Sequence, residues 1–212
     1  DLDYVGVLDG PLSPLEFEAL RAAHQRLGLA TYEGIYVTAD DLRRRPHVDA
    51  GSAHVSIAGY LPRAGFNANP ATWRTLARHG IAVRGDAPET LGVHDPDDEM
   101  IRFCREQLGS YWRPWGRRLA RDPKQALLGF TDGGVMWGTF GPLRLHCTAA
   151  TGRIISKTEA IAYGRATFGD RWARLFDQVL DAHVSGRRQP LASRPARWRE
   201  LQAFVELVTT PG

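Results

Sequence analysis

Cysteine, charge of one sign and long apolar runs are all scarce in this sequence. Cys104 and Cys147 are its two cysteines, which excludes a disulfide framework and favours a reducing, cytoplasmic compartment. No run approaches the roughly 18 apolar residues of a membrane span, and no signal peptide precedes the first expected strand. We therefore expect no membrane partner and a chain that folds in the cytoplasm.

Net charge is also low. The formal charge is +3 in 212 residues, which is too mild to predict nucleic-acid binding by itself. Arginine clusters do occur at positions 43–45, 117–118 and 187–188, and we interpret each as a solvated face. A nucleic-acid-binding protein that uses these clusters is the last of the alternatives, because they are dispersed and lack interleaved aromatic residues.

The first half of the chain mixes strand and helix patterns. Residues 1–10 ("DLDYVGVLDG") and 29–37 ("LATYEGIYV") are typical of strands. Residues 13–28 predict a helix, with Ser13 and Glu16 as a capping box. A loop-rich stretch follows to residue 69, then a short helix from Pro70 to Gly80 and a strand in "IAVRG" (81–85).

Beyond about residue 95, helix patterns dominate. They cover residues 97–109, 156–169, 170–183 and 193–208. The segment 133–152 is apolar enough for a buried helix, which Pro142 should start, kink or split. Strands in the first half and helices in the second predict an α+β protein, with one domain over 1–95 and a helical domain over 96–212.

Three acidic residues stand in strand patterns where apolar residues are expected. Asp1 and Asp3 lie two residues apart, so in a strand they point to the same face. Glu33 lies in the middle of the next expected strand. Such acids are costly unless paired or bound to a cation. Together they predict a Mg²⁺ site for nucleotide chemistry, with water-facing acids as the alternative.

The opening strand resembles the Asp-x-Asp half of the nucleotidyltransferase signature, whose Gly-Ser half we expect upstream. The chain resembles more specifically the aminoglycoside adenylyltransferases that modify streptomycin and spectinomycin. The similar stretches are "DLDYVGVLD", "YEGIYV", "LARHGIAVRG", "LRLHCTAATGRIISKTEA" and "LASRPARWRELQAFV". They span nearly the whole chain in order, and "TGRIISK" followed by "LASR" is the most specific part.

The resemblance implies a nucleotidyltransferase-fold sheet followed by a helical bundle, with the active site between them. It implies that a monomer transfers AMP from ATP to an antibiotic hydroxyl, with one or two Mg²⁺ ions. Asp1 and Asp3 match the metal ligands, and Glu33 matches the catalytic base. The positions that match nucleotide-binding residues are Asn69, Lys157 and His183.

The region that corresponds to the antibiotic site matches poorly. It offers Asp132 and Trp137, and His54 lies near the position of a further aromatic contact. The resemblance therefore leaves open a related enzyme with another acceptor, such as a protein hydroxyl or a metabolite, or a silent nucleotide- or drug-binding module. Structural roles also stay open: Asn69 as a helix N-cap, Lys157 as a solvated first-turn residue, His183 beside a helix dipole and Asp132 in a turn.

Two tryptophan groups complete the pattern. "SYWRPWGRR" contains Tyr111, Trp112 and Trp115, whose rings we expect to pack between the two domains rather than to stack on a ligand. The same packing role is expected for Trp73 and Trp172, which lie on helical faces.

Overall fold

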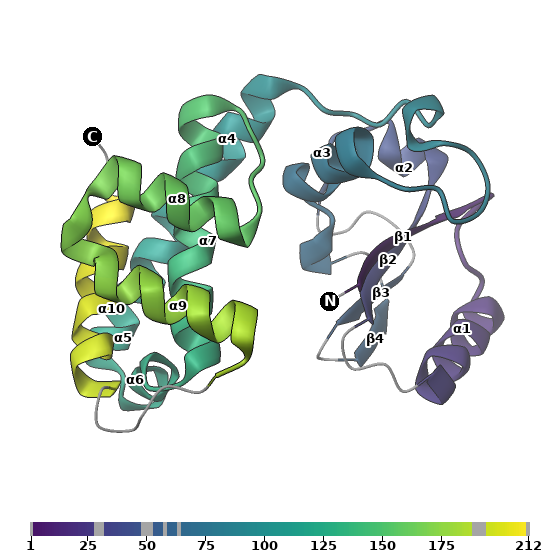
Figure 1. The fold of residues 1–212 in the computed structure, drawn as a ribbon. Helices are drawn as coiled ribbons and strands as arrows, with labels where there is room; N and C mark the ends of the chain where they lie inside the picture. The colour runs from purple at the N-terminus through teal and green to yellow at the C-terminus, as the bar shows by residue number, and fades with distance from the viewer. Residues whose placement is uncertain are drawn as a thin grey trace. The chain divides into compact units, whose positions relative to one another are not determined.

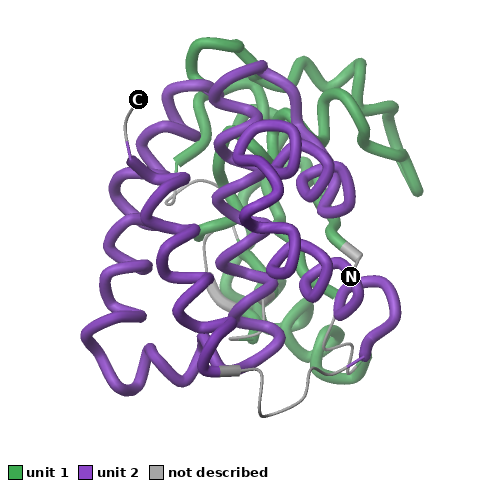
Figure 2. Tube along the Cα trace, turned by 60° about the vertical axis from the view of Figure 1, so that its left-hand side comes forward, with its two compact units in different colours: residues 1–99 green, residues 100–212 purple. Residues whose placement is uncertain are grey.

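The chain folds into two compact units, Asp1–Glu99 and Met100–Gly212 (Figures 1 and 2). The computed structural model describes residues 2–27, 32–47, 53–56, 59–62, 65–187 and 194–210. The first unit holds a sheet with short helices, and the second is helical. This arrangement confirms the predicted α+β class.

The sheet of the first unit has four strands in the order β1-β2-β3-β4. They are β1 (Leu2–Leu8), β2 (Tyr32–Thr38), β3 (Ala53–Ser56) and β4 (Gly59–Pro62). β1 and β2 are parallel, whereas β3 and β4 add in antiparallel fashion. The parallel pair requires a crossover, which contains helix α1 (Pro14–Leu27). The predicted capping box of α1 is present, with Ser13 N donating to a Glu16 carboxylate oxygen at 2.8 Å.

The two faces of this sheet carry different side chains. Helices α2 (Ala39–Leu42) and α3 (Pro70–His79) share a small apolar core with one face (Figure 1). Ile35 and Val37 supply the β2 side of that core, and Trp73 of α3 is fully buried in it. Short 3₁₀ turns at Gly65–Asn67 and Pro88–Thr90 complete the unit.

Helices α4 to α10 build the second unit. They are α4 (Asp97–Gln107), a π-helical turn (Leu108–Trp112), α5 (Arg113–Arg121), α6 (Pro123–Gly129), α7 (Asp132–Thr151), α8 (Lys157–Phe168), a 3₁₀ turn (Asp170–Trp172), α9 (Ala173–Ser185) and α10 (Arg194–Thr209). The four helices predicted over 97–109, 156–169, 170–183 and 193–208 are thus confirmed, apart from their end residues. α4 starts in the first unit and continues into the second without a break.

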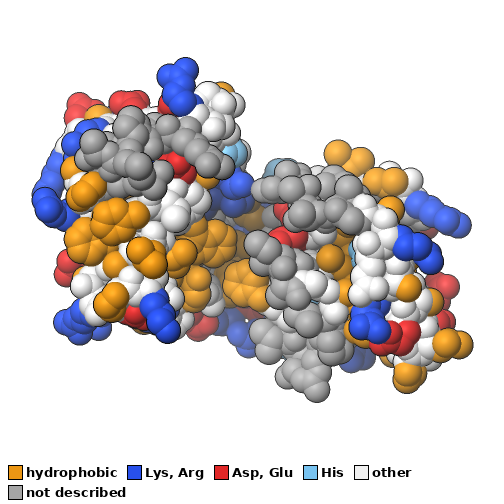
Figure 3. All heavy atoms as spheres, turned by 90° about the horizontal axis from the view of Figure 1, so that it is seen from below, with side chains coloured by type: hydrophobic (Ala, Val, Ile, Leu, Met, Phe, Trp, Pro, Cys, Tyr) orange, Lys and Arg blue, Asp and Glu red, His pale blue; other side chains and the backbone are white. Residues whose placement is uncertain are grey.

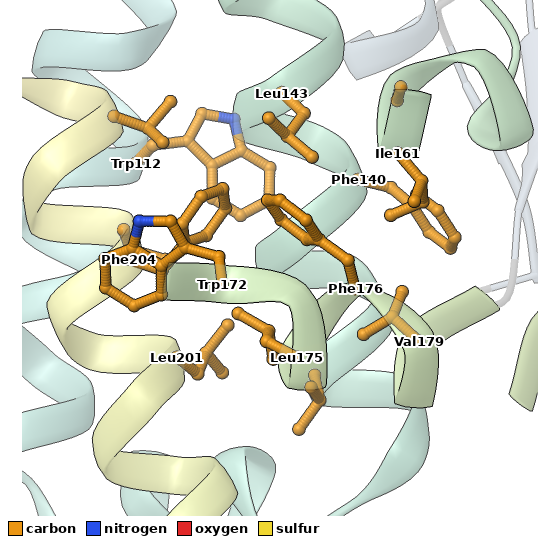
Figure 4. Close-up of a cluster of buried hydrophobic side chains, with 14 of the residues drawn as sticks. Trp112, Phe140, Leu143, Ile161, Trp172, Leu175, Phe176, Val179, Leu201 and Phe204 are labelled. Atoms are coloured by element: carbon orange, nitrogen blue, oxygen red, sulfur yellow. The ribbon is translucent and has the colours of Figure 1, made fainter. Parts of the chain in front are cut away.

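A large apolar core holds the helical unit together. Phe176 and Phe204 meet edge to face with ring centroids 5.3 Å apart, and Trp172 lies 5.2 Å from Phe204 (Figure 4). All three side chains are almost fully buried. Aromatic pairs at this spacing add packing energy beyond their buried area.

The central helix α7 runs through Pro142 without a break, so Pro142 neither starts nor splits it. Its glycines explain how it fits the core. A Cβ on Gly138 would lie 2.5 Å from the Trp115 ring, and one on Gly141 would lie 2.1 Å from the Trp112 ring. Both tryptophans therefore pack against bare helix backbone inside the second unit, rather than in the interdomain position that we expected.

Two expectations for the first unit are wrong. Residues 81–85 form no strand, and Ile81 and Val83 are about nine-tenths exposed (87% and 97%). A strand needs a hydrogen-bonding neighbour, and in the described sheet β1 to β4 pair only with one another. Conversely, the stretch expected to be a loop up to residue 69 contains β3 and β4.

Candidate functional site

The strand register brings two of the three predicted acids together. Asp3 of β1 is the direct partner of Glu33 on the parallel strand β2. Directly paired residues of a sheet share a face, and neighbouring strands lie about 4.8 Å apart. Asp3 is exposed and Glu33 is partly buried. The two carboxylates therefore start neighbouring strands side by side, where one cation can meet both.

Asp1, the third predicted acid, lies outside the described residues. Within the part of the chain that is described, no group of three or more His, Cys, Asp or Glu side chains is placed to hold a metal ion. The carboxylates of Asp3 and Glu33 nevertheless fit Mg²⁺, which prefers oxygen ligands and is commonly bound by one or two carboxylates plus substrate phosphates.

Asp3 and Glu33 lie on the face of the sheet that packs against the apolar core. By strand alternation, Asp3 shares its face with Val5, and Glu33 shares its face with Ile35 and Val37. Ile35 and Val37 are fully buried. The acids thus stand at the edge of the core, where a low-dielectric wall on one side strengthens their field.

His54, a predicted acceptor-binding residue, lies on the same face as the acids. His54 of β3 pairs with Ile35 of β2, and Ile35 follows Glu33 by two residues, so all three share one face of the sheet. The His54 ring packs against the backbone of Gly65, where a Cβ would lie 2.6 Å from the imidazole carbon Cε1. Gly65 also has a φ of 56°, a value that favours glycine. The glycine therefore allows the imidazole to lie directly on the 3₁₀ turn.

The opposite face of the sheet carries a cluster of phenols and one imidazole. His24 Nε2 of α1 lies 2.7 Å from the Tyr36 hydroxyl and 3.3 Å from the Tyr4 hydroxyl. Burial lowers the pKa of His24, raises the pKa of Tyr4 and Tyr36, and raises the pKa of Tyr60 to about 12. This cluster is neutral at pH 7 and faces away from Asp3 and Glu33.

Asn69, a predicted nucleotide-binding residue, caps helix α3. Its side-chain oxygen accepts from the N–H groups of Ala71 and Thr72, at 2.9 and 3.1 Å. Its amide nitrogen donates to the Phe66 carbonyl oxygen at 2.9 Å. The side-chain oxygen thus caps the helix start and one amide hydrogen is bonded to the preceding turn, and the nucleotide role stays a prediction.

Lys157, the predicted phosphate-binding residue, occupies the first turn of α8. Ser156 and Glu159 form the predicted capping box there, with Ser156 N donating to a Glu159 carboxylate oxygen at 2.8 Å. The helix N-terminus and the lysine ammonium add two positive contributions at one place, which suits an anionic ligand.

His183, also predicted to bind the nucleotide, lies in the last turn of α9. The ring is exposed and meets Phe140 edge to face, with centroids 5.3 Å apart. One side of the imidazole is therefore fixed by the core, and the rest is accessible to solvent.

Asp132, a predicted acceptor-binding acid, is already paired. Its carboxylate oxygen Oδ1 lies 2.5 Å from Nη1 of Arg197, a side chain of α10 that is only 2% exposed. A buried guanidinium without a counter-charge would be strongly destabilising. This ion pair therefore gives Asp132 a structural role between α7 and α10.

Trp137 is half exposed and borders a pocket of the helical unit. The pocket measures about 410 Å³ and is lined by Tyr111, Trp115, Arg118, Gln125, Gly133 and Trp137, among others. Trp137 rests on Trp112, with ring centroids 5.4 Å apart. Sequence analysis singled out the tryptophan, assigned Arg118 to a solvated cluster, and missed Gln125, because a single helical Gln carries no distinguishing pattern.

Among the described residues, no helix is both long and apolar enough to cross a membrane.

No family model and no curated protein sequence matches the chain. Among solved structures, the chain is similar to the crystal structure of spectinomycin adenyltransferase AAD(9) from Enterococcus faecialis with ATP and spectinomycin, with a TM-score of 0.67. The two sequences are 13% identical, and the match covers 99% of this chain and 84% of that chain. At that identity the likeness shows that the two chains share a fold, and it shows nothing more.

Proposed function

We propose that this protein is a Mg²⁺-dependent nucleotidyltransferase that transfers AMP from ATP to a hydroxyl of a small molecule and releases pyrophosphate. An aminoglycoside-type antibiotic is the first candidate acceptor, and inactivation of the drug would be the result. The observation that carries the proposal is the direct pairing of Asp3 with Glu33 on neighbouring strands, in a fold shared with an adenyltransferase.

The acidic side chains have distinct roles in this proposal. Asp1 and Asp3 hold Mg²⁺, which neutralises charge on the triphosphate when it is bound. Glu33 accepts the proton of the acceptor hydroxyl on its carboxylate. The freed oxygen attacks the α-phosphorus of ATP, and the bond to the β-phosphate oxygen breaks as pyrophosphate leaves. Most of the rate enhancement comes from positioning the reactants and from charge stabilisation.

Three residues have proposed roles in binding the nucleotide. Lys157, at the start of α8, is proposed to bind phosphate oxygens together with the helix N-terminus. His183 offers an exposed ring face to the nucleotide. Asn69 is the third proposed contact, and the capping bonds of its side chain oppose this role.

The acceptor is the least constrained part of the proposal. His54 shares the face of Asp3 and Glu33, which favours a contact with the acceptor. Asp132 and Trp137 are the proposed contacts of the helical unit. Cationic aminoglycosides need carboxylates for their ammonium groups, whereas Asp132 already pairs with Arg197. That pairing favours a second candidate, the same reaction on a less cationic hydroxyl compound.

Pyrophosphate release from Mg·ATP, measured with streptomycin, spectinomycin and other aminoglycosides, tests the proposal. Loss of the base in Glu33→Gln should lower kcat about 10²- to 10⁴-fold while the protein still binds ATP. The matched control is Asp9→Asn, an exposed acid in the turn after β1, which should keep the parent rate. Glu33→Gln with the parent rate would overturn the proposed base.

Calorimetry with Mg·ATP tests the metal ligand separately. Asp3→Asn should weaken Mg²⁺-dependent ATP binding, and an unchanged affinity would remove Asp3 from the metal site. Thermal stabilisation of the parent protein by ATP or drug, without any pyrophosphate release, would identify a silent binding module and contradict the proposed reaction.

A further inference from the structure

The pocket of the helical unit beside Trp137 has a lining that suits a particular class of ligand. Aromatic rings form its walls. The Trp115 side chain is only 4% exposed, whereas the Tyr111 and Trp137 side chains are 37% and 48% exposed. The Trp112 ring contacts the two more exposed rings. Its centroid lies 5.1 Å from that of Tyr111 and 5.4 Å from that of Trp137. A flat ring stacks well on such fixed aromatic faces.

The electrostatics of the pocket are positive. Arg118 of α5 is the charged side chain among the described lining residues, and none of these residues is an Asp or a Glu. Gly133 lies in the first turn of the 20-residue helix α7, where backbone N–H groups and the helix dipole favour negative charge. A Cβ at Gly133 would meet nothing within 4 Å, so the backbone there is accessible.

The acid beside this pocket does not cancel the positive field. Asp132 precedes Gly133 in the same helical turn, and its carboxylate forms the ion pair with Arg197. The Arg197 side chain is only 2% exposed, so this pair is fixed in the protein interior. An ammonium group of a ligand would therefore find Arg118 and a helix N-terminus in the pocket, and a carboxylate that is already neutralised.

We propose that the pocket between Tyr111, Trp115 and Trp137 binds a planar aromatic ligand that carries a negative charge, and that it disfavours polycations. The ring lies on the tryptophan and tyrosine faces, and the negative charge lies toward Arg118 and the start of α7. Figure 3 shows hydrophobic side chains exposed on the helical unit, with Lys and Arg side chains beside them. This inference replaces the acceptor contact proposed for Trp137, and it is tested apart from the reaction because binding needs no nucleotide.

A matched series of bicyclic probes tests this inference by isothermal calorimetry on the full chain without ATP. The anionic probe is 6-hydroxy-2-naphthoate, the neutral probe is 2-naphthol and the cationic probe is 2-naphthylmethylammonium. We expect the anionic probe to bind about tenfold more tightly than the neutral one, since a charge-assisted hydrogen bond to arginine is worth about 1.5 kcal/mol or more. The cationic probe and spectinomycin should bind more weakly still.

Substitutions locate the binding. Arg118→Gln should lower the affinity for 6-hydroxy-2-naphthoate about tenfold and leave the affinity for 2-naphthol unchanged. Trp137→Leu should weaken both probes, because both stack on the ring. Arg117→Gln is the matched control: this arginine is exposed on the same helix and does not line the pocket, so both affinities should stay at the parent values. Neither Arg117 nor Arg118 has a role in the proposed reaction.

The outcomes of these experiments distinguish ligand binding in the pocket from the proposed nucleotidyl transfer. Equal affinity for the three probes, or equal losses in Arg118→Gln and Arg117→Gln, would overturn the anionic preference. Tighter binding of spectinomycin than of the anionic probe, lost in Trp137→Leu, would make the pocket an aminoglycoside site and also overturn the inference. Pyrophosphate release with an aminoglycoside that is unaffected by Arg118→Gln would support the reaction and leave the pocket as a site for a separate ligand.

Discussion

The two units of the chain are stabilised in different ways. The helical unit has a continuous apolar core in which Phe176, Trp172 and Phe204 meet edge to face. The sheet unit has a much smaller apolar core around Trp73. Each unit buries a paired arginine, Arg74 in the sheet unit and Arg197 in the helical unit, and the sheet unit adds the cluster of phenols around His24.

That difference indicates that the two units have different roles. Apolar packing is non-directional and insensitive to pH, so the helical unit can serve as a rigid framework. The sheet unit places the carboxylates of Asp3 and Glu33 side by side on one face of a thin sheet, where the proposed reaction would use them for proton transfer and cation binding. We therefore expect core truncation to affect the helical unit most, and charge changes or acidification to affect the sheet unit most.

The largest stability effect should come from the helical core. Phe204→Ala removes an aromatic side chain that is 0% exposed and should cost about 3–5 kcal/mol in the free energy of unfolding. Leu207→Ala, on the same helix α10 but 46% exposed, should cost less than about 1 kcal/mol. Chemical denaturation followed by circular dichroism measures both values, and comparable losses would show that the α10 core face is not the main source of stability.

A smaller effect is expected from the ion network of the sheet unit. Nε of Arg74 lies 2.5 Å from Asp95 Oδ1, and Nε of Arg78 lies 2.8 Å from the other oxygen of the same carboxylate. Arg74 is buried and Arg78 is about half exposed. Removal of Arg74 deletes the buried partner and its charge-assisted hydrogen bond, whereas Asp95 keeps its bond to Arg78.

Arg74→Met should therefore cost about 1–3 kcal/mol, and Arg78→Met less than about 1 kcal/mol. Denaturant midpoints of the two variants give the comparison, and addition of salt should reduce the Arg78→Met effect further. Equal losses of unfolding free energy in the two variants would show that burial does not determine the strength of this ion network. The contrast between the two units would then no longer include polar interactions.

Local sequence signals predicted much of this fold. Ser13 with Glu16, and Ser156 with Glu159, marked two helix starts that the structure confirms. These motifs work because a capping box is complete within four residues and needs no distant partner. The α+β class followed from the same reasoning, since strand and helix patterns occupy different halves of the chain.

Interactions between distant residues could not be predicted in this way. The pairing of Asp132 with Arg197 joins positions 65 residues apart, and no local pattern marks either partner. The "IAVRG" segment has strand propensity but no neighbouring strand, so propensity alone was misleading. The position of Asp3 opposite Glu33 depends on strand register, which a single sequence leaves undetermined.

The smallest expected effect is a pH dependence of the sheet unit. His24 is partly buried against the hydroxyls of Tyr4 and Tyr36, and burial lowers its pKa below the ordinary value of 6.5. The phenols around it stay neutral, because burial raises the pKa of Tyr4, Tyr36 and Tyr60. Below about pH 6.5 the unfolded chain therefore binds a proton at His24 more readily than the folded chain does.

Stability should accordingly be unaffected by His24 above that pH and should fall as the pH drops below it. The melting temperature of the parent protein should decrease between pH 7 and 5.5, and His24→Gln should show a shallower decrease. Burial also lowers the pKa of His146 in the helical unit, so part of the slope should remain. The exposed His79 of α3 provides the control, because His79→Gln should keep the full slope. A parent-like slope in His24→Gln would mean that acid sensitivity does not arise in the phenol cluster, and the proposed difference between the two units would then rest on the arginine network alone.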